Sequence, residues 1–378
     1  MDNAAAKLPE TSQRIARLTP LADVLACVDA LVRPVVPREV ALAQALGRVV
    51  AGDPTVATRP QAAVALRDGW AVNSDRTADA GPYAPVPLRA AVRIEVGAPL
   101  PQGTDAVAEI NAVTIRNGRP EAIAPIAAGD GVLPAGADAA PSALLLQDGR
   151  RLTAIRAAVL GAVGIERVAI RAPSMRVLRA RPGPDAIIDA AVDFVARAVE
   201  AAGGAARADR NDSLRLDDAL RDPEADAVMI VGGTGSGRND ASVATLARRG
   251  RVEAHGIALS PGETAAFGFV GTRPVLLLPG RLDAALAVWL LIGARILARL
   301  SGSSEEPQAA TARLVRKATS SLGMAELMLV RCHGGTAEPL ASGYLSLQAL
   351  AQADGWILVP ADSEGYPAGH DVMVRPWP

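Results

Sequence analysis

Residues Asp226 to Asp240 read DAVMIVGGTGSGRND, an apolar run that passes into four glycines and ends on an aspartate. Val228 to Val231 are typical of a strand buried on both faces, as in parallel sheets. Glycines lack Cβ atoms, so they can adopt positive φ and turn successive N–H groups toward one anion. The Ala-rich run after Asp240 predicts a helix whose N-terminus adds partial positive charge. The stretch therefore predicts a strand, a loop for phosphate or another oxyanion, and a helix.

Known phosphate-binding motifs fit this loop only in part. A Rossmann fingerprint that starts at Gly233 would need a third glycine or alanine where Arg238 stands. A Walker loop would need Gly-Lys followed by Ser or Thr, which the loop does not contain. A tight strand-to-helix turn without a ligand is the alternative interpretation.

Length and composition limit the classes of protein to which the chain can belong. Its 378 residues exceed what one hydrophobic core holds, so we expect several domains. The formal net charge is −1, which does not indicate a nucleic-acid surface. The start of the chain lacks the apolar core of a signal peptide, and Gly293 and Arg295 interrupt the longest apolar segment. We therefore expect no membrane span and, with only two cysteines, a reducing cytoplasm.

Motifs for metal binding or nucleophilic catalysis are weak. His255, His333 and His370 stand apart without ligand spacing, and Cys332 beside His333 cannot close a zinc site. No serine lies in the G-x-S-x-G motif of α/β-hydrolases. Carboxylates, hydroxyl groups and Gly-rich backbone remain as the reactive groups.

The first half of the chain predicts helices and then a β module. Leu18 to Leu46 have the spacing of two short helices, split by a segment with two prolines. From Val49 to about Pro141, short β-type runs alternate with Gly and Pro turns, which is typical of a small all-β module. A helix is predicted over Ala154 to Ala162.

The second half predicts an α/β sheet. From Met175 onward, strands alternate with helices through the loop strand at Val228 to Val231, and the series ends on a long buried helix from Ala284 to Leu300. Alternation of this kind predicts a mostly parallel sheet with helices on both faces. Ligands bind beyond the carboxyl ends of such strands, where Gly232 lies. After a linker at residues 301–306 the chain returns to β-type runs.

Seven motifs in the same order resemble those of the molybdopterin molybdenumtransferases of the MoeA and gephyrin E-domain type. They are LRDGWAV from Leu66, GAPLPQGTDAV from Gly97, GGTGSG from Gly232 with Asp240 behind it, SPGETAAFG from Ser260, LPGRL from Leu278, SGYLSL from Ser342 and AGHDV from Ala368. The motifs are spread along the chain, so the resemblance covers nearly all of it.

The resemblance implies a multidomain α/β plus β fold. Its parts are a helical linker domain (residues 18–47 and 141–172), an inserted β domain (48–140), a doubly wound molybdopterin-binding α/β domain (173–303) and a C-terminal β domain (304–378). It also implies a homodimer, in which the site lies between the binding domain of one subunit and the inserted domain of the other. Molybdoenzymes or other cofactor-biosynthesis proteins are further candidate partners.

The activity implied is the insertion of molybdate into molybdopterin, with adenylylated molybdopterin and molybdate as substrates and Mg2+ as cofactor. The catalytic residues implied are Asp68, Asp185 and Asp240, of which Asp185 and Asp240 would also hold the metal. Carboxylates can hold Mg2+ beside a pyrophosphate, and a Gly-rich nest can take the terminal phosphate. Residues implied to bind the pterin substrate are Gly232, Gly233, Thr234, Gly235, Ser236, Gly237, Ser260, Pro279 and Gly280.

Purely structural roles are the alternatives for these acidic residues. Asp68 can begin a turn before Gly69, Asp185 can cap the helix that starts near Ala186, and Asp240 can cap the helix that follows it. Asp209 or Asp212 is a further candidate for the acidic residue that precedes the loop strand in the family.

The sequence also departs from the family pattern. The two lysines of K-P-G-K-P are Ser260 and Glu263, so an anion would meet a weaker field, and the motif threonine is Val96. The G-G-T-G spelling of the loop is that of the sister adenylyltransferases of the MogA type. Two alternatives to the molybdenumtransferase follow: a non-catalytic relative that binds molybdopterin, the finished cofactor or a client protein, and an enzyme for another anionic phosphorylated small molecule.

Overall fold

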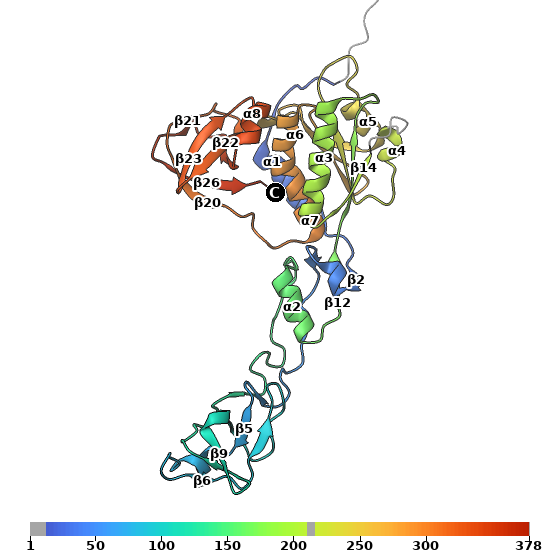
Figure 1. Cartoon of the computed structure of the whole chain (residues 1–378). Coiled ribbons are helices and arrows are strands. Elements are labelled where there is room, and N and C mark those ends of the chain that lie inside the picture. Colours follow the sequence, from blue (N-terminus) through green and yellow to red (C-terminus); the bar gives the residue numbers. More distant parts are fainter. Residues whose placement is uncertain (1–12, 210–215, 378) are drawn as a thin grey trace, which may run out of the picture. The chain divides into compact units, whose positions relative to one another are not determined.

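The computed structural model describes residues 13–209 and 216–377, and its chain contacts divide it into two compact units (Figure 1). The first unit holds the chain up to Gly52, Asp148–Ala154 and everything from Arg167 onward. The second holds Asp53–Gln147 and Ile155–Glu166. This division by contacts is coarser than the four domains expected from the resemblance.

A six-stranded sheet forms the centre of the first unit, in the order β14-β13-β15-β19-β18-β16. Four strands are parallel: β14 (Ala205–Asp209), β13 (Ser174–Arg179), β15 (Ala227–Val231) and β19 (Arg273–Leu278). The antiparallel strands β18 (Ala266–Val270) and β16 (Arg251–His255) close one edge. All five residues of β15 are buried, because the strand is covered on both faces.

Helices cover both faces of this sheet, as the alternation of strands and helices predicts. On one face α3 (Ala186–Ala201) packs beside α6 (Leu282–Val288) (Figure 1). Met175 of β13, Met229 of β15 and Leu276 of β19 belong to the core on this face. On the other face α4 (Leu216–Ala219) and α5 (Ser242–Arg249) cover Val228 and Ile230. The doubly wound fold is therefore confirmed.

The long apolar helix is a core element. It runs through α6, a π-helical turn at Trp289–Gly293 and α7 (Ala294–Ser301). By length and composition the helix Leu282–Ser301 could cross a membrane, but 67% of its most apolar window is buried inside the protein. Trp289, 1% exposed, lies in the main core with α3 and the sheet, so the predicted buried helix is a core helix in the structure.

The last part of the chain closes a small barrel. Its ring is β22 (Ala325–His333), β23 (Thr336–Ala341), β20 (Ala310–Leu314), β26 (Asp371–Pro376) and β24 (Gly355–Val359), which pairs again with β22. β17 (Ile257–Ser260) adds to β22 in parallel, and β1 (Thr19–Pro20) adds to β17. The remaining elements are α8 (Leu347–Gln352) and the pair β21 (Ala318–Thr319) and β25 (Gly365–Tyr366). The expected C-terminal β structure is present within the first unit, where β17 pairs with β22 of the barrel.

One helix prediction is wrong. The first helix exists as α1 (Leu21–Leu31), but the second is replaced by β2 (Arg38–Ala41) and a 3-10 turn at Leu42–Ala45. β2 and β3 (Val49–Val50) flank β12 (Arg167–Arg171) in a three-stranded sheet. Long-range pairing with β12 therefore overrides the local helical spacing after Pro37.

The second unit is built of short strands, as its turn-rich sequence predicts. β7 (Val92–Ile94), β5 (Gly69–Val72) and β8 (Ala106–Ala108) form one sheet. β6 (Val86–Pro87), β10 (Arg119–Ala122) and β9 (Val113–Arg116) form another, and β11 (Val132–Leu133) pairs with β4 (Val64–Ala65). The predicted helix α2 spans Ala154–Ala162.

Candidate functional site

The glycine loop leaves the carboxyl end of β15 in a conformation that requires glycine. Gly232 and Gly233 have φ of +93° and +70°, a region that L-residues with side chains rarely adopt. A Cβ at Gly233 would lie 2.4 Å from Oγ of Ser242, and Gly280 lies close to Cα of Gly232. The loop is therefore tied to α5 on one side and to the L-P-G segment after β19 on the other.

Thr234 holds the loop from a third direction. It is 2% exposed, and its Oγ1 lies 3.1 Å from Oγ1 of Thr264, in the turn between β17 and β18. Nε2 of His255 donates to the carbonyl oxygen of Thr234 at 3.1 Å. The loop is thus a fixed structure, which is what a preformed ligand site requires.

A cavity of about 440 Å³ opens beside this loop, at the carboxyl ends of the parallel strands. Its lining comes from the ends of β13, β15 and β19, from the start of α3 and from Thr264. The lining residues are Ala180, Arg181, Asp185, Ile187, Ile188, Gly232, Gly233, Thr234, Gly235, Asp240, Thr264, Pro279, Gly280 and Arg281. Eight residues predicted from the sequence therefore share one cavity: Asp185, Asp240, Gly232, Gly233, Thr234, Gly235, Pro279 and Gly280.

Asp240 forms an ion pair with Arg181, and both residues line this cavity. Its Oδ1 pairs with the guanidinium of Arg181, and its Oδ2 accepts the N–H of Gly237 at 3.1 Å. The capping interpretation of Asp240 is wrong, because α5 begins after Ala241 without a cap from its own neighbours. Gln13 takes that place, since its Oε1 accepts the N–H groups of Val243 and Ala244.

The partial positive charge that the N-terminus of α5 is expected to add at the ligand remains a prediction, but this helix end offers no uncapped amide from Val243 or Ala244. Its first amides are satisfied by Gln13, and neither Val243 nor Ala244 lines the cavity among the described residues. The positive groups that do reach the cavity are side chains and the loop backbone.

Asp185 caps α3 and also lines the cavity. Its Oδ1 accepts the N–H groups of Ile187 and Ile188 at 3.0 and 3.1 Å, so the capping interpretation is confirmed. A carboxylate at the first turn also matches the helix dipole. The two hydrogen bonds hold Oδ1 of Asp185 at the helix N-terminus. Asp185 is at the same time one of the residues that line the cavity.

Arg281 brings a second guanidinium group to the cavity lining. Its Nε and Nη2 donate to Asp283 at 3.1 and 2.6 Å, and its guanidinium lies 5.2 Å from the ring centre of Tyr344. Asp283 is 3% exposed and also accepts the N–H of Leu345 at 3.1 Å. The hydrogen bond to Asp283 holds the pKa of Arg281 above its ordinary value, so the guanidinium stays charged. The contacts to Asp283 use Nε and Nη2 of Arg281, a residue that also lines the cavity.

Several predicted residues lie elsewhere. Ser236, Gly237 and Ser260 do not line the cavity among the described residues, and Ser260 ends β17 before Pro261. Asp209 ends β14, and Asp212 lies outside the described residues. Sequence reasoning missed Arg181, Thr264 and Arg281 as cavity residues. A signal existed for the two arginines, since Arg181 follows a parallel strand and Arg281 replaces the asparagine of L-P-G-N-P.

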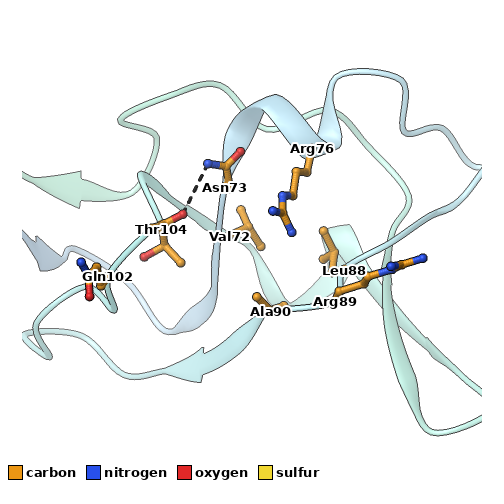
Figure 2. A pocket seen from close by; sticks show the side chains of 10 residues that line it. Val72, Asn73, Arg76, Leu88, Arg89, Ala90, Gln102 and Thr104 are labelled. Atoms are coloured by element: carbon orange, nitrogen blue, oxygen red, sulfur yellow. Dashed lines mark hydrogen bonds between the residues drawn. The ribbon is translucent and has the colours of Figure 1, made fainter.

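Asp68 belongs to the second unit, where it connects two motifs. Its Oδ1 accepts the N–H of Val96 at 2.8 Å, so the residue that replaces the motif threonine still contacts the motif aspartate through its backbone. Elsewhere in this unit, Figure 2 shows a smaller hollow of about 210 Å³ between Arg76, Leu88 and Thr104. The side chains of Arg76 and Arg89 there are exposed, and Asp68 is not part of its lining among the described residues.

Comparison with known proteins decides the family. Family profiles match three consecutive stretches: "MoeA N-terminal region (domain I and II)" at residues 19–164, "Probable molybdopterin binding domain" at 162–299 and "MoeA C-terminal region (domain IV)" at 311–377. Molybdopterin molybdenumtransferase 1 of Mycobacterium tuberculosis is 30% identical over 320 residues, which cover 76% of this chain and 74% of that protein. The chain belongs to the MoeA family of molybdopterin molybdenumtransferases.

Other MoeA relatives agree with this assignment. The crystal structure of the molybdopterin biosynthesis MoeA protein from Pyrococcus horikoshii has a TM-score of 0.77 and 27% identity, and the match covers 95% of this chain and 99% of that one. A putative molybdopterin biosynthesis protein of Methanocaldococcus jannaschii is 29% identical over 167 residues, which are 44% of this chain and 40% of that protein. The family and the fold predicted from the seven motifs are confirmed.

Proposed function

We propose that this MoeA-family protein acts in molybdenum cofactor biosynthesis, where it inserts molybdate into molybdopterin that arrives adenylylated. One observation carries the proposal: the family's glycine loop and L-P-G segment meet Asp185 and Asp240 around a single cavity of about 440 Å³. Such a volume is in the range of small-molecule sites. In a chain of this family, the expected occupant is the phosphorylated pterin.

The residues present can bind the phosphate groups of such a substrate. The turn at Gly232 and Gly233 exposes loop backbone to the cavity, and backbone amides in this kind of turn are ready anion donors. Arg181 and Arg281 add two guanidinium groups, which hydrogen-bond phosphate oxygens in pairs. We therefore assign to these arginines directed hydrogen bonds to the phosphate groups, in place of the two family lysines.

Mg2+ is part of the proposal as a resident cofactor. Asp185 and Asp240 line the same cavity, and two carboxylates suffice for Mg2+ when substrate phosphates and water complete its shell. Among residues 13–209 and 216–377 no three or more His, Cys, Asp or Glu side chains are grouped so that they could hold a metal ion by themselves. When bound, the ion would neutralise charge on the phosphates. Release of the ion pair between Asp240 and Arg181 would free a carboxylate for the ion and a guanidinium for the substrate.

The homodimer, the cytoplasmic location and the four-domain division complete the proposal. The homodimer and the domains rest on the family resemblance, and the location rests on the presence of only two cysteines. A dimer with a shared site makes a sharp prediction. Asp68→Asn and Asp240→Asn subunits, each inactive alone, would form mixed dimers with one intact site of two, so an equal mixture would recover about a quarter of wild-type activity. A mixture as inactive as either variant would contradict the shared site.

Complementation tests the function itself. In a bacterial strain that lacks its own molybdenumtransferase, the wild-type gene is expected to restore nitrate reductase activity. Asp240→Asn is expected to fail, while Asp362→Asn, a change of an exposed aspartate in the barrel region, should complement like the wild type. Failure of the wild type to complement, at normal expression, would contradict the transferase. Thermal stabilisation by molybdopterin would then identify a binding protein without turnover.

A further inference from the structure

We propose that Gln13 is a positioning residue of the glycine loop, and this inference rests on the proposed function of that loop as the phosphate site. Gln13 is 2% exposed although it lies near the start of the described chain. Its Nε2 donates to the carbonyl oxygens of Gly233 and Gly235 at 3.0 and 2.9 Å. Its Oε1 accepts from the N–H groups of Val243 and Ala244 at 3.0 and 3.1 Å. One side chain therefore uses its full hydrogen-bonding capacity to join the loop to α5.

The geometry of the peptide bond gives these contacts a directional effect. In a trans peptide, the C=O of one residue and the N–H of the next point in opposite directions. Because Gln13 holds the carbonyl groups of Gly233 and Gly235, the N–H groups of Thr234 and Ser236 point away from Gln13. Thr234 and Gly235 line the cavity and Gln13 does not. Of these two amides only that of Thr234 belongs to the cavity lining among the described residues, so Gln13 favours its direction toward a phosphate bound there.

The rest of the segment fixes Gln13 in register. Ile15 packs against Gly256, where a Cβ would lie only 2.4 Å from Cγ2 of Ile15, so a side chain there would displace the segment. Thr19–Pro20 then pair in parallel with β17. Gly256 directly follows His255, which holds the carbonyl of Thr234. The N-terminal segment and the β16–β17 turn therefore hold the loop from neighbouring points.

The two ends of the Gln13 amide can be tested separately. Gln13→Glu keeps an acceptor for Val243 and Ala244 but faces the two loop carbonyls with a carboxylate, which cannot donate. Gln13→Ala removes both halves. Arg14→Ala, a change of the exposed neighbour in the same segment, serves as the matched control. Hydrogen exchange of the Val243 and Ala244 amides reports the hydrogen bonds that Oε1 of Gln13 accepts. KM for adenylylated molybdopterin reports the orientation of the loop, which Nε2 of Gln13 holds.

The proposal predicts a split between these two measurements. Gln13→Ala should raise amide exchange of Val243 and Ala244 and raise KM, each by about tenfold, the size of one or two lost hydrogen bonds. Gln13→Glu should raise KM at least as much while it leaves the exchange of those two amides near the wild-type rate. Arg14→Ala should change neither, and kcat should change less than KM in every variant.

Two results would overturn the proposal. One is unchanged exchange of Val243 and Ala244 in Gln13→Ala. The other is a KM that follows only the melting temperature across the three variants, because Gln13 would then act on general stability. If the wild-type protein shows no turnover, the proposed function fails, and the exchange experiment, which needs no substrate, still decides whether Gln13 holds the loop.

Discussion

Gly233→Ala is the substitution whose cost can be worked out most directly from the structure. At φ of +70° an alanine carries a strain of about 1–2 kcal/mol. Its Cβ would lie 2.4 Å from Oγ of Ser242 and 3.1 Å from Cβ of Ala180. Ser242 must turn away and lose its hydrogen bond to the carbonyl of Gly232, now 2.9 Å long, which costs about 1 kcal/mol more. We expect a total loss of about 2–3 kcal/mol in the free energy of unfolding.

Gly271→Ala separates the strain from the crowding. Gly271 has φ of +62°, in the turn between β18 and β19, and a Cβ added there would meet no atom within 4 Å. This change should therefore cost only the strain of about 1–2 kcal/mol. Urea unfolding measures both variants, followed by the fluorescence of the four tryptophans, of which Trp289 and Trp356 are buried.

Ligand affinity gives the second comparison between these variants. Gly233→Ala moves the loop that lines the cavity, so its affinity for adenylylated molybdopterin should fall at least about tenfold, whereas Gly271→Ala should bind like the wild type. If Gly233→Ala is no more destabilising than Gly271→Ala and binds with wild-type affinity, both the crowding at Ser242 and the role of the loop are refuted.

Three further predictions concern charged groups. Arg281→Ala should weaken binding of adenylylated molybdopterin by about tenfold or more in calorimetric titrations, with Arg281→Lys between it and the wild type, because a lysine lacks the paired donors. The hydrogen bond from Arg295 lowers the pKa of Asp29, so this contact stabilises the fold above the unfolded value of about 3.9 and is lost as the pH falls through the lowered value. Asp29→Asn should therefore cost at most about 1 kcal/mol at pH 7 and nothing at pH 2, as thermal melts would measure. Partial desolvation and then the charge of Asp354 raise the pKa of Cys332, so Asp354→Asn should speed alkylation of Cys332 at pH 8 about twofold, as mass spectrometry would follow.

The central part of the fold was predictable because its signals are local. A run of apolar residues that ends in glycines indicated β15 and its loop, and a capping aspartate with a long apolar period indicated α3 from Asp185 onward. The glycines of the loop are required by positive φ and by the approach of Ser242, which the sequence pattern expresses directly.

Long-range contacts account for what the sequence did not reveal. Residues 38–46 have helical spacing, yet β2 pairs with β12, more than a hundred residues further along the chain. The cap of α5 is Gln13, 230 residues before Val243, so no local motif could identify it in place of Asp240. The barrel is closed by the pairing of β22 with β24, two strands that are not neighbours along the chain, so no local sequence pattern indicates this pairing.

The positive charge of the cavity was only partly predictable. The loss of the two lysines at Ser260 and Glu263 is visible in the sequence and suggested a weak field for anions. Arg181 and Arg281 reach the cavity from the ends of two different strands, and only the fold brings them together. Their carboxylate partners, Asp240 and Asp283, balance those charges, so the arginines contribute directed hydrogen bonds more than net field.

Molybdate insertion by the purified wild-type protein is the most direct test of the central claim. The protein is supplied with adenylylated molybdopterin, molybdate and Mg2+, and the product is read out by reconstitution of an apo-molybdoenzyme, with an established molybdenumtransferase as positive control. We predict reconstitution that falls at least about a hundredfold in Asp240→Asn, because loss of a metal ligand should cost at least as much as the loss of about 10–100-fold that is typical of an outer-shell partner. No reconstitution above the protein-free background, while the positive control works, would contradict the assignment of the cavity as a molybdenumtransferase site.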